Sequence, residues 1–340
     1  MKREKRRLWL IPVTLIILIS TAIIIKQYRE TQELKAQKVK YVVSAFFVDG
    51  EAYCVAGDEK NNFSRKFDNY TEYNELPDGK TMTWCESREC FYYCDGTKLY
   101  TCSLDGKNNE RIWKAPDGNY IRIKFITNEW VVIDARFNSG GLLHSMPIGA
   151  SSRASYALNL ESGDVTELSG RMGRAVSPNY FAGEGGTFFY YTENGDIGRT
   201  DVEAGNVTDT KLCSVSGLDV KLGYVMGNYV YFSNNNLLYR IAVEGNEDGK
   251  AELLKLSLPD NMRYFDALTS SESDIIIALS DSRNYSTYTL CTLNPDTLEI
   301  KKIPNQAEGI SVRGLIADST RYYAWSGKDT FSGEIYENGG

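Results

Sequence analysis

Seven cysteines and a single histidine are the residues that most directly suggest metal or thiol chemistry in this chain. Four of the cysteines, Cys85, Cys90, Cys94 and Cys102, fall within 18 residues of one another, at spacings of five, four and eight. No Cys-x-x-Cys pair occurs, and His144 is remote from them. Zinc sites usually show such pairs. We therefore expect no metal site.

The four clustered cysteines form a candidate disulfide cluster instead. They lie on a predicted hairpin, where a four-residue turn would set Cys85 opposite Cys90 and a three-residue loop would set Cys90 opposite Cys102. An exported location permits disulfides. The alternative is that several are small buried strand residues with free thiols. An odd total of seven means that they cannot all pair within one chain.

The second candidate site is a long loop from Arg136 to Ser155 that contains the only histidine. It is rich in Gly and Ser but carries four large apolar residues, which a solvated loop rarely places so close together. Long loops on rigid scaffolds often carry binding sites. The loop either folds back over the domain or offers a surface to a partner. Its candidate binding residues are Leu142, Leu143, His144, Met146 and Ile148.

Sequence motifs for catalysis are missing. No Gly-x-Ser-x-Gly, His-Glu-x-x-His, phosphate-loop or Asp-rich calcium-loop pattern is present, so no catalytic residue and no cofactor is predicted. Carboxylates are plentiful, but the sequence does not show which of them face one another.

The elements that must position these residues repeat along the chain. Seven apolar stretches, each preceded by a turn and, in all units but the last, followed by two further strand signals, have anchors separated by 39, 39, 58, 42, 45 and 46 residues. A period in the forties without intervening helices is typical of β-propeller blades. We expect an all-β propeller of four-stranded blades, seven favoured and six or eight open. The stretches are Ala52–Gly57, Cys90–Asp95, Trp130–Ala135, Thr187–Thr192, Tyr229–Asn234, Asp274–Leu279 and Arg321–Ser326.

One unit resembles a known family. The segment Phe91–Gly106, FYYCDGTKLYTCSLDG, is similar to the YWTD-type blades of low-density-lipoprotein-receptor propellers, which also occur in bacterial surface domains. Here Tyr93-Cys94-Asp95 replaces Trp-Thr-Asp, and that family has six blades where we count seven. The Pro-Asp-Gly turns give a weaker similarity to TolB-like propellers.

Closure of the ring is also predictable from the repeat. The last unit shows three strand signals and no fourth, while Tyr41 to Phe47 precedes a fairly complete first unit. We expect this amino-terminal strand to complete the last blade and to remove two exposed edges.

The amino terminus reads as a membrane anchor. Residues 1–7 form a basic tail, and residues 8–25 are an apolar run that would rise about 27 Å as a helix, close to the thickness of a hydrocarbon core. The cations before the run predict a cytoplasmic amino terminus. Residues 26–40 form a polar stalk, and residues 41–340 form the extracytoplasmic propeller. A cleaved signal peptide ending near Ser20-Thr21-Ala22 is the alternative.

Charge and architecture together indicate a binding module. Residues 41–340 carry a net charge of −14, which disfavours nucleic acid as a partner. We expect a non-catalytic, membrane-anchored extracytoplasmic propeller that binds a protein or a cell-envelope glycan. Exposed Tyr and Trp could stack on sugars, although aromatics also fill blade interfaces. The rival is a propeller-type polysaccharide hydrolase or lyase that uses carboxylates at the channel mouth.

Overall fold

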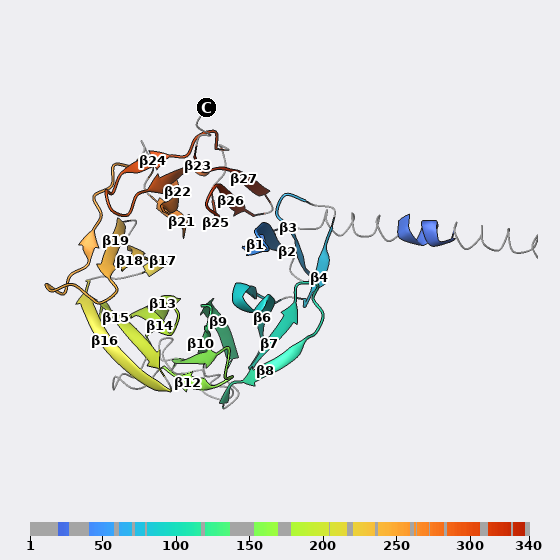
Figure 1. The fold of residues 1–340 in the computed structure, drawn as a ribbon, viewed down its shortest axis with the longest axis horizontal. Helices are drawn as coiled ribbons and strands as arrows, with labels where there is room; N and C mark the ends of the chain where they lie inside the picture. The colour runs from blue at the N-terminus through green and yellow to red at the C-terminus, as the bar shows by residue number, and fades with distance from the viewer. Residues whose placement is uncertain are drawn as a thin grey trace, which may run out of the picture.

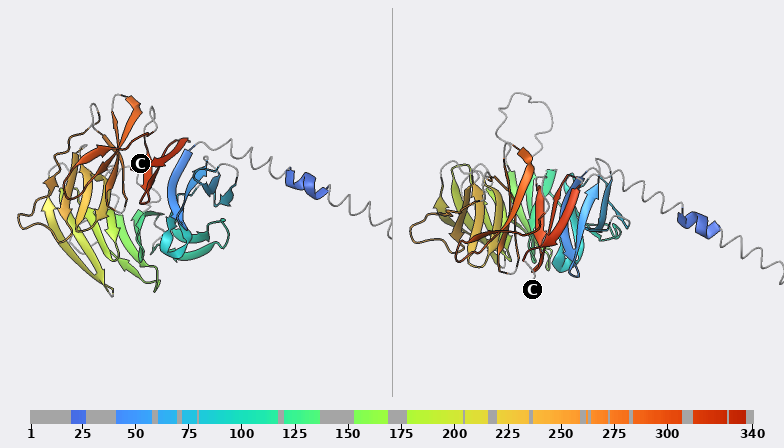
Figure 2. Two further views of the ribbon diagram at one scale, coloured as in Figure 1. Left: turned by 45° about the horizontal axis from the view of Figure 1, so that its top comes forward. Right: turned by 90° about the horizontal axis from the view of Figure 1, so that it is seen from above.

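The computed structural model is a ring of seven antiparallel sheets arranged around a central axis, a seven-bladed β-propeller (Figure 1). Seen edge-on, the ring is a flat disc with the strands running across its thickness (Figure 2). The structure describes residues 20–26, 41–57, 61–69, 72–78, 80–116, 120–136, 153–168, 178–203, 205–215, 220–234, 237–258, 262, 264–271, 273–281, 284–306, 312–327 and 329–336.

The first four blades occupy the chain up to Ser214, and each contributes four strands. Blade 1 is β1 (Tyr41–Val48), β2 (Glu51–Gly57), β3 (Asn62–Lys66) and β4 (Asn74–Leu76). Blade 2 is β5 (Met82–Cys85), β6 (Cys90–Asp95), β7 (Lys98–Ser103) and β8 (Glu110–Lys114), with the 3-10 turn η1 (Glu86–Arg88) between β5 and β6. Blade 3 is β9 (Tyr120–Ile126), β10 (Trp130–Arg136), β11 (Arg153–Asn159) and β12 (Val165–Glu167). Blade 4 is β13 (Asn179–Glu184), β14 (Thr187–Tyr191), β15 (Asp196–Glu203) and β16 (Asn206–Ser214).

The remaining three blades differ in strand number. Blade 5 is β17 (Val220–Met226), β18 (Tyr229–Asn234), β19 (Leu237–Ala242) and β20 (Glu252–Leu253). Blade 6 is β21 (Tyr264–Ser270), β22 (Ile275–Asp281), β23 (Asn284–Leu293) and β24 (Ile300–Lys302). Blade 7 has three strands in the described part of the chain: β25 (Gly314–Ala317), β26 (Arg321–Ser326) and β27 (Asp329–Glu334).

The seven apolar stretches are the second strands of the seven blades, as predicted. Each is sandwiched between the neighbouring sheets, so both of its faces are buried; Ile275, Ile276 and Ile277 of β22 are all 0 % exposed. A strand buried on both faces reads as a continuous apolar run, because neither set of alternating side chains meets water. The repeat in the sequence therefore predicted the blade count.

Neighbouring blades meet in hydrophobic clusters, and in six interfaces the fourth strand contributes to the cluster. A buried apolar residue within or directly after that strand packs between its own blade and the next. Burial of such a side chain stabilises the contact by about 1.5–3 kcal/mol. These six residues are Leu76, Ala115, Leu168, Leu212, Leu254 and Ile303.

The predicted closure of the ring is wrong. Tyr41 to Phe47 lies in β1, which is the innermost strand of blade 1 and pairs with β2, not with blade 7. The reason is local: Asp49 and Gly50 both adopt positive φ, 51° and 76°, as a tight type I′ hairpin turn requires. Closing such a short hairpin costs little entropy, so β1 folds back onto its neighbour in sequence.

The amino-terminal expectations fall almost entirely outside the described residues. Of the predicted anchor and stalk, the structure describes residues 20–26, which are helical and exposed. Among the residues that can be described, no helix combines the length and apolarity needed to span a bilayer.

Candidate functional site

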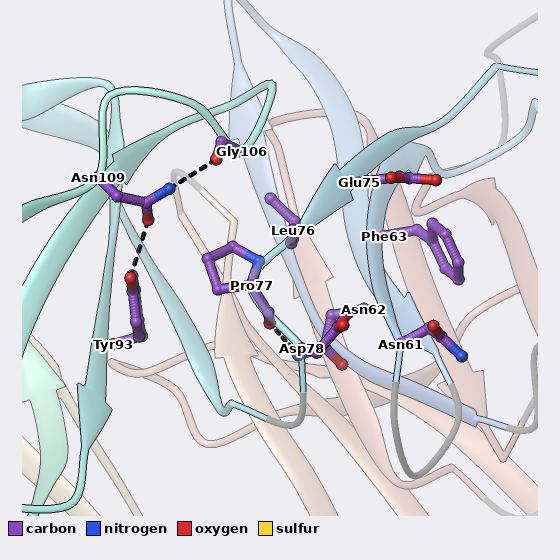
Figure 3. Close-up of a pocket in the computed structure, with 10 residues that line it drawn as sticks. All are labelled: Asn61, Asn62, Phe63, Glu75, Leu76, Pro77, Asp78, Tyr93, Gly106 and Asn109. Atoms are coloured by element: carbon purple, nitrogen blue, oxygen red, sulfur yellow. Dashed lines mark hydrogen bonds between the residues drawn. The ribbon is translucent and has the colours of Figure 1, made fainter.

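A groove of about 390 Å³ runs between the outer strands of blades 1 and 2, and we call it the rim groove (Figure 3). Five amide and carboxylate side chains border it, together with Tyr93 from β6. Its apolar wall comes from Phe63, Leu76 and Pro77. The amides and carboxylates are those of Asn61, Asn62, Asn109, Glu75 and Asp78.

The blade 1 wall is held by Asn62, the first residue of β3. Its side chain is 3 % exposed. The Nδ2 atom donates to the carbonyl oxygens of Pro77 at 3.1 Å and of Lys80 at 2.7 Å. These bonds fix the link that carries the chain from β4 to β5. Asn62 is therefore structural, whereas Asp78 on the same link is exposed.

The blade 2 wall is a hydrogen-bonded chain of side chains. The phenol of Tyr93 donates to Oδ1 of Asn109 at 2.8 Å, and Nδ2 of Asn109 donates to the carbonyl of Gly106 at 3.0 Å (Figure 3). Burial raises the pKa of Tyr93 to about 12, and the Cys102 thiol adds to this shift, so the phenol stays protonated as a donor. Tyr93 also stacks on Tyr100, with ring centroids 5.3 Å apart.

The two walls are joined at the turn between β7 and β8. Gly106 has a φ of 74°, and a Cβ atom there would collide with the carbonyl of Glu75 in β4. The hydroxyl of Ser64 in β3 donates to the carbonyl of Leu104 at 2.7 Å. Only glycine allows the turn to approach β4 so closely. The groove is thus a rigid feature of the blade 1–blade 2 interface.

These residue types suit a ligand rich in hydroxyl groups. Amide and carboxylate groups can donate to or accept from hydroxyls, and a pocket with fixed polar groups and an apolar wall can orient a ligand. Among the described residues that line the groove there is no lysine or arginine. Across the described residues, no group of three or more His, Cys, Asp or Glu side chains could hold a metal ion.

The four clustered cysteines lie in blade 2, where Cys85, Cys90 and Cys94 pack towards blade 3 and Cys102 packs towards blade 1. All seven cysteines of the chain are free thiols in the structure. Cys85 does lie opposite Cys90, as one of the two predicted registers had it. Cys102 lies opposite Phe91, so the register that paired it with Cys90 is wrong. The β6–β7 loop has two residues, because Gly96 takes a φ of 61° at its first position.

Burial makes three of these thiols poor nucleophiles. It raises the pKa of Cys90 to about 11 and those of Cys94 and Cys102 to about 12. The thiolate is the reactive form of cysteine. As free thiols, these cysteines therefore contribute to the hydrophobic packing of blade 2.

The predicted binding residues of the long loop, Leu142, Leu143, His144, Met146 and Ile148, lie outside the described residues. The loop leaves β10 at Arg136 and returns to β11 at Arg153, and these two residues are Cα partners.

One buried carboxylate lies on the second strand of blade 3. Asp134 on β10 is 3 % exposed, and its carboxylate oxygens lie 3.2 Å from the Arg122 guanidinium and 3.7 Å from the Lys124 ammonium of β9. The Ser155 hydroxyl donates to it at 3.2 Å. Asp134 is paired with two cations of its own blade, so we interpret it as a structural carboxylate of blade 3.

Comparisons with known proteins support the propeller fold but do not identify a function. No family model matches the chain. No curated protein matches it either. Among solved structures it is similar to virginiamycin B lyase from Staphylococcus aureus, at 15 % identity and a TM-score of 0.56, covering 87 % of this chain and 95 % of that one. It is also similar to an oligogalacturonate lyase in complex with manganese, at 12 % identity and a TM-score of 0.61, covering 85 % and 86 %.

A third similar structure is PorZ, a bacterial surface component of the type-IX secretion system of Porphyromonas gingivalis. The identity is 12 %, the TM-score is 0.56, and the match covers 88 % of this chain and 37 % of that one. At such identities the likeness is one of fold alone. Lyases and a surface component share the propeller, so function has to be argued from the site.

Sequence reasoning missed the rim groove. Its residues come from two blades and span positions 61 to 109, and their side chains converge only when the blades pack. The one sequence signal near this position is the Pro-Asp-Gly motif at residues 77–79, which is typical of a turn.

Proposed function

We propose that this chain is a non-catalytic binding module whose rim groove takes a neutral glycan of the cell envelope. The observation that carries the proposal is the composition of the groove: five amide or carboxylate side chains, including the exposed carboxylates of Glu75 and Asp78, and an apolar wall, all on a rigid interface. Its volume of about 390 Å³ is at the small end of ligand pockets, as one or two sugar rings require.

The cellular location of the propeller is part of the same proposal. The apolar run at residues 8–25 behind a basic tail supports an anchor with the propeller on the outer side of the membrane, as does the resemblance of Phe91–Gly106 to blades of receptor and surface propellers. A partner held in the envelope, either a glycan or a protein, would be within reach. A reporter enzyme active only outside the cytoplasm, fused after Gly340, would be active under this proposal and inactive if the domain lies inside.

The direct test is binding of neutral envelope oligosaccharides to the full-length chain, measured by calorimetry. Glu75→Ala and Asp78→Ala remove exposed groove carboxylates without touching the network around Asn62 and Tyr93. Each lost hydrogen bond to a carboxylate should weaken binding by about 1.5 kcal/mol, or roughly tenfold. Glu161→Ala in the β11–β12 turn is the matched control and should bind like the parent protein. Equal affinity of all three variants would place the site elsewhere.

A second candidate function, a polysaccharide hydrolase, has one observation in its favour: two carboxyl groups, those of Glu75 and Asp78, border the same groove. Glycosidases act with such a pair. Glu75→Gln and Asp78→Asn keep the side-chain volume. Loss of reducing-end release with retained binding would support the enzyme, and absence of release from the parent protein would support the binding module.

A further inference from the structure

The two cysteines at the base of the hairpin between β5 and β6 lie directly opposite each other. Cys85 ends β5 and Cys90 begins β6, and the two are Cα partners in the antiparallel ladder. Partners in such a ladder have Cα atoms about 4.5–5.5 Å apart. A disulfide bridge spans Cα atoms about 4.4–6.8 Å apart. The backbone of this hairpin therefore has the spacing that a bridge between Cys85 and Cys90 needs.

Both side chains also lie on the same face of blade 2. Side chains of directly opposed residues share one side of a sheet, and both cysteines pack in the hydrophobic cluster between blades 2 and 3. Cys85 is 2 % exposed, whereas Cys90 is partly exposed. A disulfide reagent can therefore reach Cys90 from solvent more readily than it can reach Cys85.

The same geometry excludes the other cysteines as partners. Cys94 lies four residues along β6 from Cys90, which is about 13 Å at the rise of a β-strand. Cys102 is opposite Phe91 and packs on the other face of the sheet, in the cluster between blades 1 and 2. The remaining three each lie in a cluster that contains no other cysteine: Cys54, Cys213 and Cys291. Among the seven cysteines, all of which the structure describes, one pair therefore has bridging geometry.

The four-residue turn between the two cysteines contacts blade 3. It consists of η1 and Glu89, which takes a φ of 50°, and all four residues are exposed. The Ser87 hydroxyl donates to the carbonyl of Asn128 at 2.8 Å, and the Arg88 guanidinium donates to the carbonyl of Leu160 at 2.8 Å. A covalent link at the base of the turn would limit how far these two donors move away from blade 3 when the hairpin opens.

We propose that Cys85 and Cys90 form a disulfide bridge when the chain meets a disulfide oxidant, and that the bridge holds the β5–β6 turn on blade 3. This modification site is separate from the rim groove and goes beyond the function proposed there. Binding of a glycan neither requires the bridge nor produces it. Oxidising compartments outside the cytoplasm supply oxidants of this class.

The reaction consists of two thiol–disulfide exchanges. The Cys90 thiolate attacks one sulfur of the oxidant, a mixed disulfide forms, and the oxidant's own S–S bond breaks to release one thiolate. The Cys85 thiolate then attacks the Cys90 sulfur and releases the second thiolate. The two cysteines together lose two electrons, and their two protons end on the two released thiols. Because burial raises the pKa of Cys90 to about 11, the first exchange is slow in the folded protein at neutral pH.

The test incubates the reduced full-length chain in detergent with oxidised glutathione and then blocks the remaining thiols with N-ethylmaleimide in denaturant. Trypsin cleaves after Arg88, between the two cysteines, and yields the peptides Thr81–Arg88 and Glu89–Lys98. The bridge should hold these two peptides together in mass spectrometry until a reductant separates them. The oxidised protein should also melt about 2–5 °C higher than the reduced protein.

Matched variants identify the sulfur atoms. Cys94→Ala removes the other cysteine of the second peptide and should keep both the linked peptides and the melting shift. Cys90→Ala should lose both. Melting temperatures of the reduced variants show that each one folds.

A second incubation, in urea below the unfolding transition, opens the turn transiently and removes the limit set by slow exchange. Absence of linked peptides in both incubations, or a link to Cys94 or Cys102, overturns the proposed pairing. A bridge between Cys85 and Cys90 without a rise in melting temperature overturns its role in holding the turn on blade 3.

Discussion

At the interface between blades 1 and 2, Leu76 at the end of β4 is buried against Met82 and Phe91. The Ser64 hydroxyl adds a hydrogen bond across this interface, and Asn62 adds one to the link between the two blades. At the seam between blades 7 and 1, the described residues contain no fourth strand of blade 7. There the backbone N–H of Val42 donates to the carbonyl of Gly327 at 2.6 Å. Below the surface, Tyr323 and Trp325 pack on Phe67. At the surface, the Asp68 carboxylate accepts a hydrogen bond from Ser332 and forms an ion pair with Arg321.

The difference shows that, in the described part of the ring, blades 7 and 1 meet by packing their sheet faces together, and β1 pairs within blade 1 instead of completing blade 7. Aromatic burial replaces the aliphatic residue and the strand pairing that a shared blade would provide. T-shaped contacts at 5.7 Å between Phe47 and Tyr323 and at 5.5 Å between Phe67 and Tyr323 are part of that replacement. We therefore expect the seam to be the interface that opens first, and the following predictions test this expectation.

The largest effect is expected from removing β1. Deletion of residues 1–48 removes Val42 and Phe46, each 7 % exposed, together with the seam hydrogen bond, so we expect loss of cooperative unfolding in calorimetry. Deletion of residues 1–38 leaves β1 whole and should change the free energy of unfolding by less than about 0.5 kcal/mol. Equal melting temperatures for the two truncations would show that β1 is dispensable to the ring.

Phe67→Ala and Phe91→Ala compare the two interfaces directly, because both side chains are 0 % exposed. Each should lower the free energy of unfolding by about 3–5 kcal/mol in denaturant titration. Hydrogen exchange should separate them: the seam variant should exchange faster in β1 and β26, and Phe91→Ala faster in β5 and β6. Identical exchange patterns would contradict a weak seam.

Gly106→Ala and Gly50→Ala share a positive φ, 74° and 76°, but differ in surroundings. At position 106 the new Cβ meets the Glu75 carbonyl of blade 1, whereas nothing lies within 4 Å at position 50. We expect about 2–3 kcal/mol of destabilisation for Gly106→Ala and about 1 kcal/mol for Gly50→Ala, measured by urea unfolding. Similar costs would mean that the turn yields and that the rim groove is less rigid than its contacts indicate.

The smallest effect is expected at the surface of the seam. Asp68→Ala removes an exposed pair with Arg321 at 3.7 Å and the acceptor of Ser332. The expected loss is under about 1 kcal/mol, and it should shrink in high salt, because screening weakens exposed ion pairs. A larger, salt-independent loss would show that the seam depends on this network more than on its aromatic cluster.

The sequence by itself determined the repeating parts of the molecule. The second strands are apolar runs such as Cys90–Asp95 and Tyr229–Asn234, and both match strands residue for residue. Burial on two faces leaves few polar positions, so the pattern is visible without a structure. The hairpin between β1 and β2 was equally local, since Asp49-Gly50 specifies it, yet we assigned its first strand to the wrong blade.

Only the tertiary structure decided how the ring closes and where a ligand would fit. The seam joins Val42 to Gly327, and the rim groove joins Asn62 to Asn109 across two blades. Contacts of this kind depend on how whole sheets pack, and no spacing along the chain encodes which outer strands will face one another. The blade is therefore predictable from periodicity, whereas the spaces between blades, where the candidate sites lie, are set by packing.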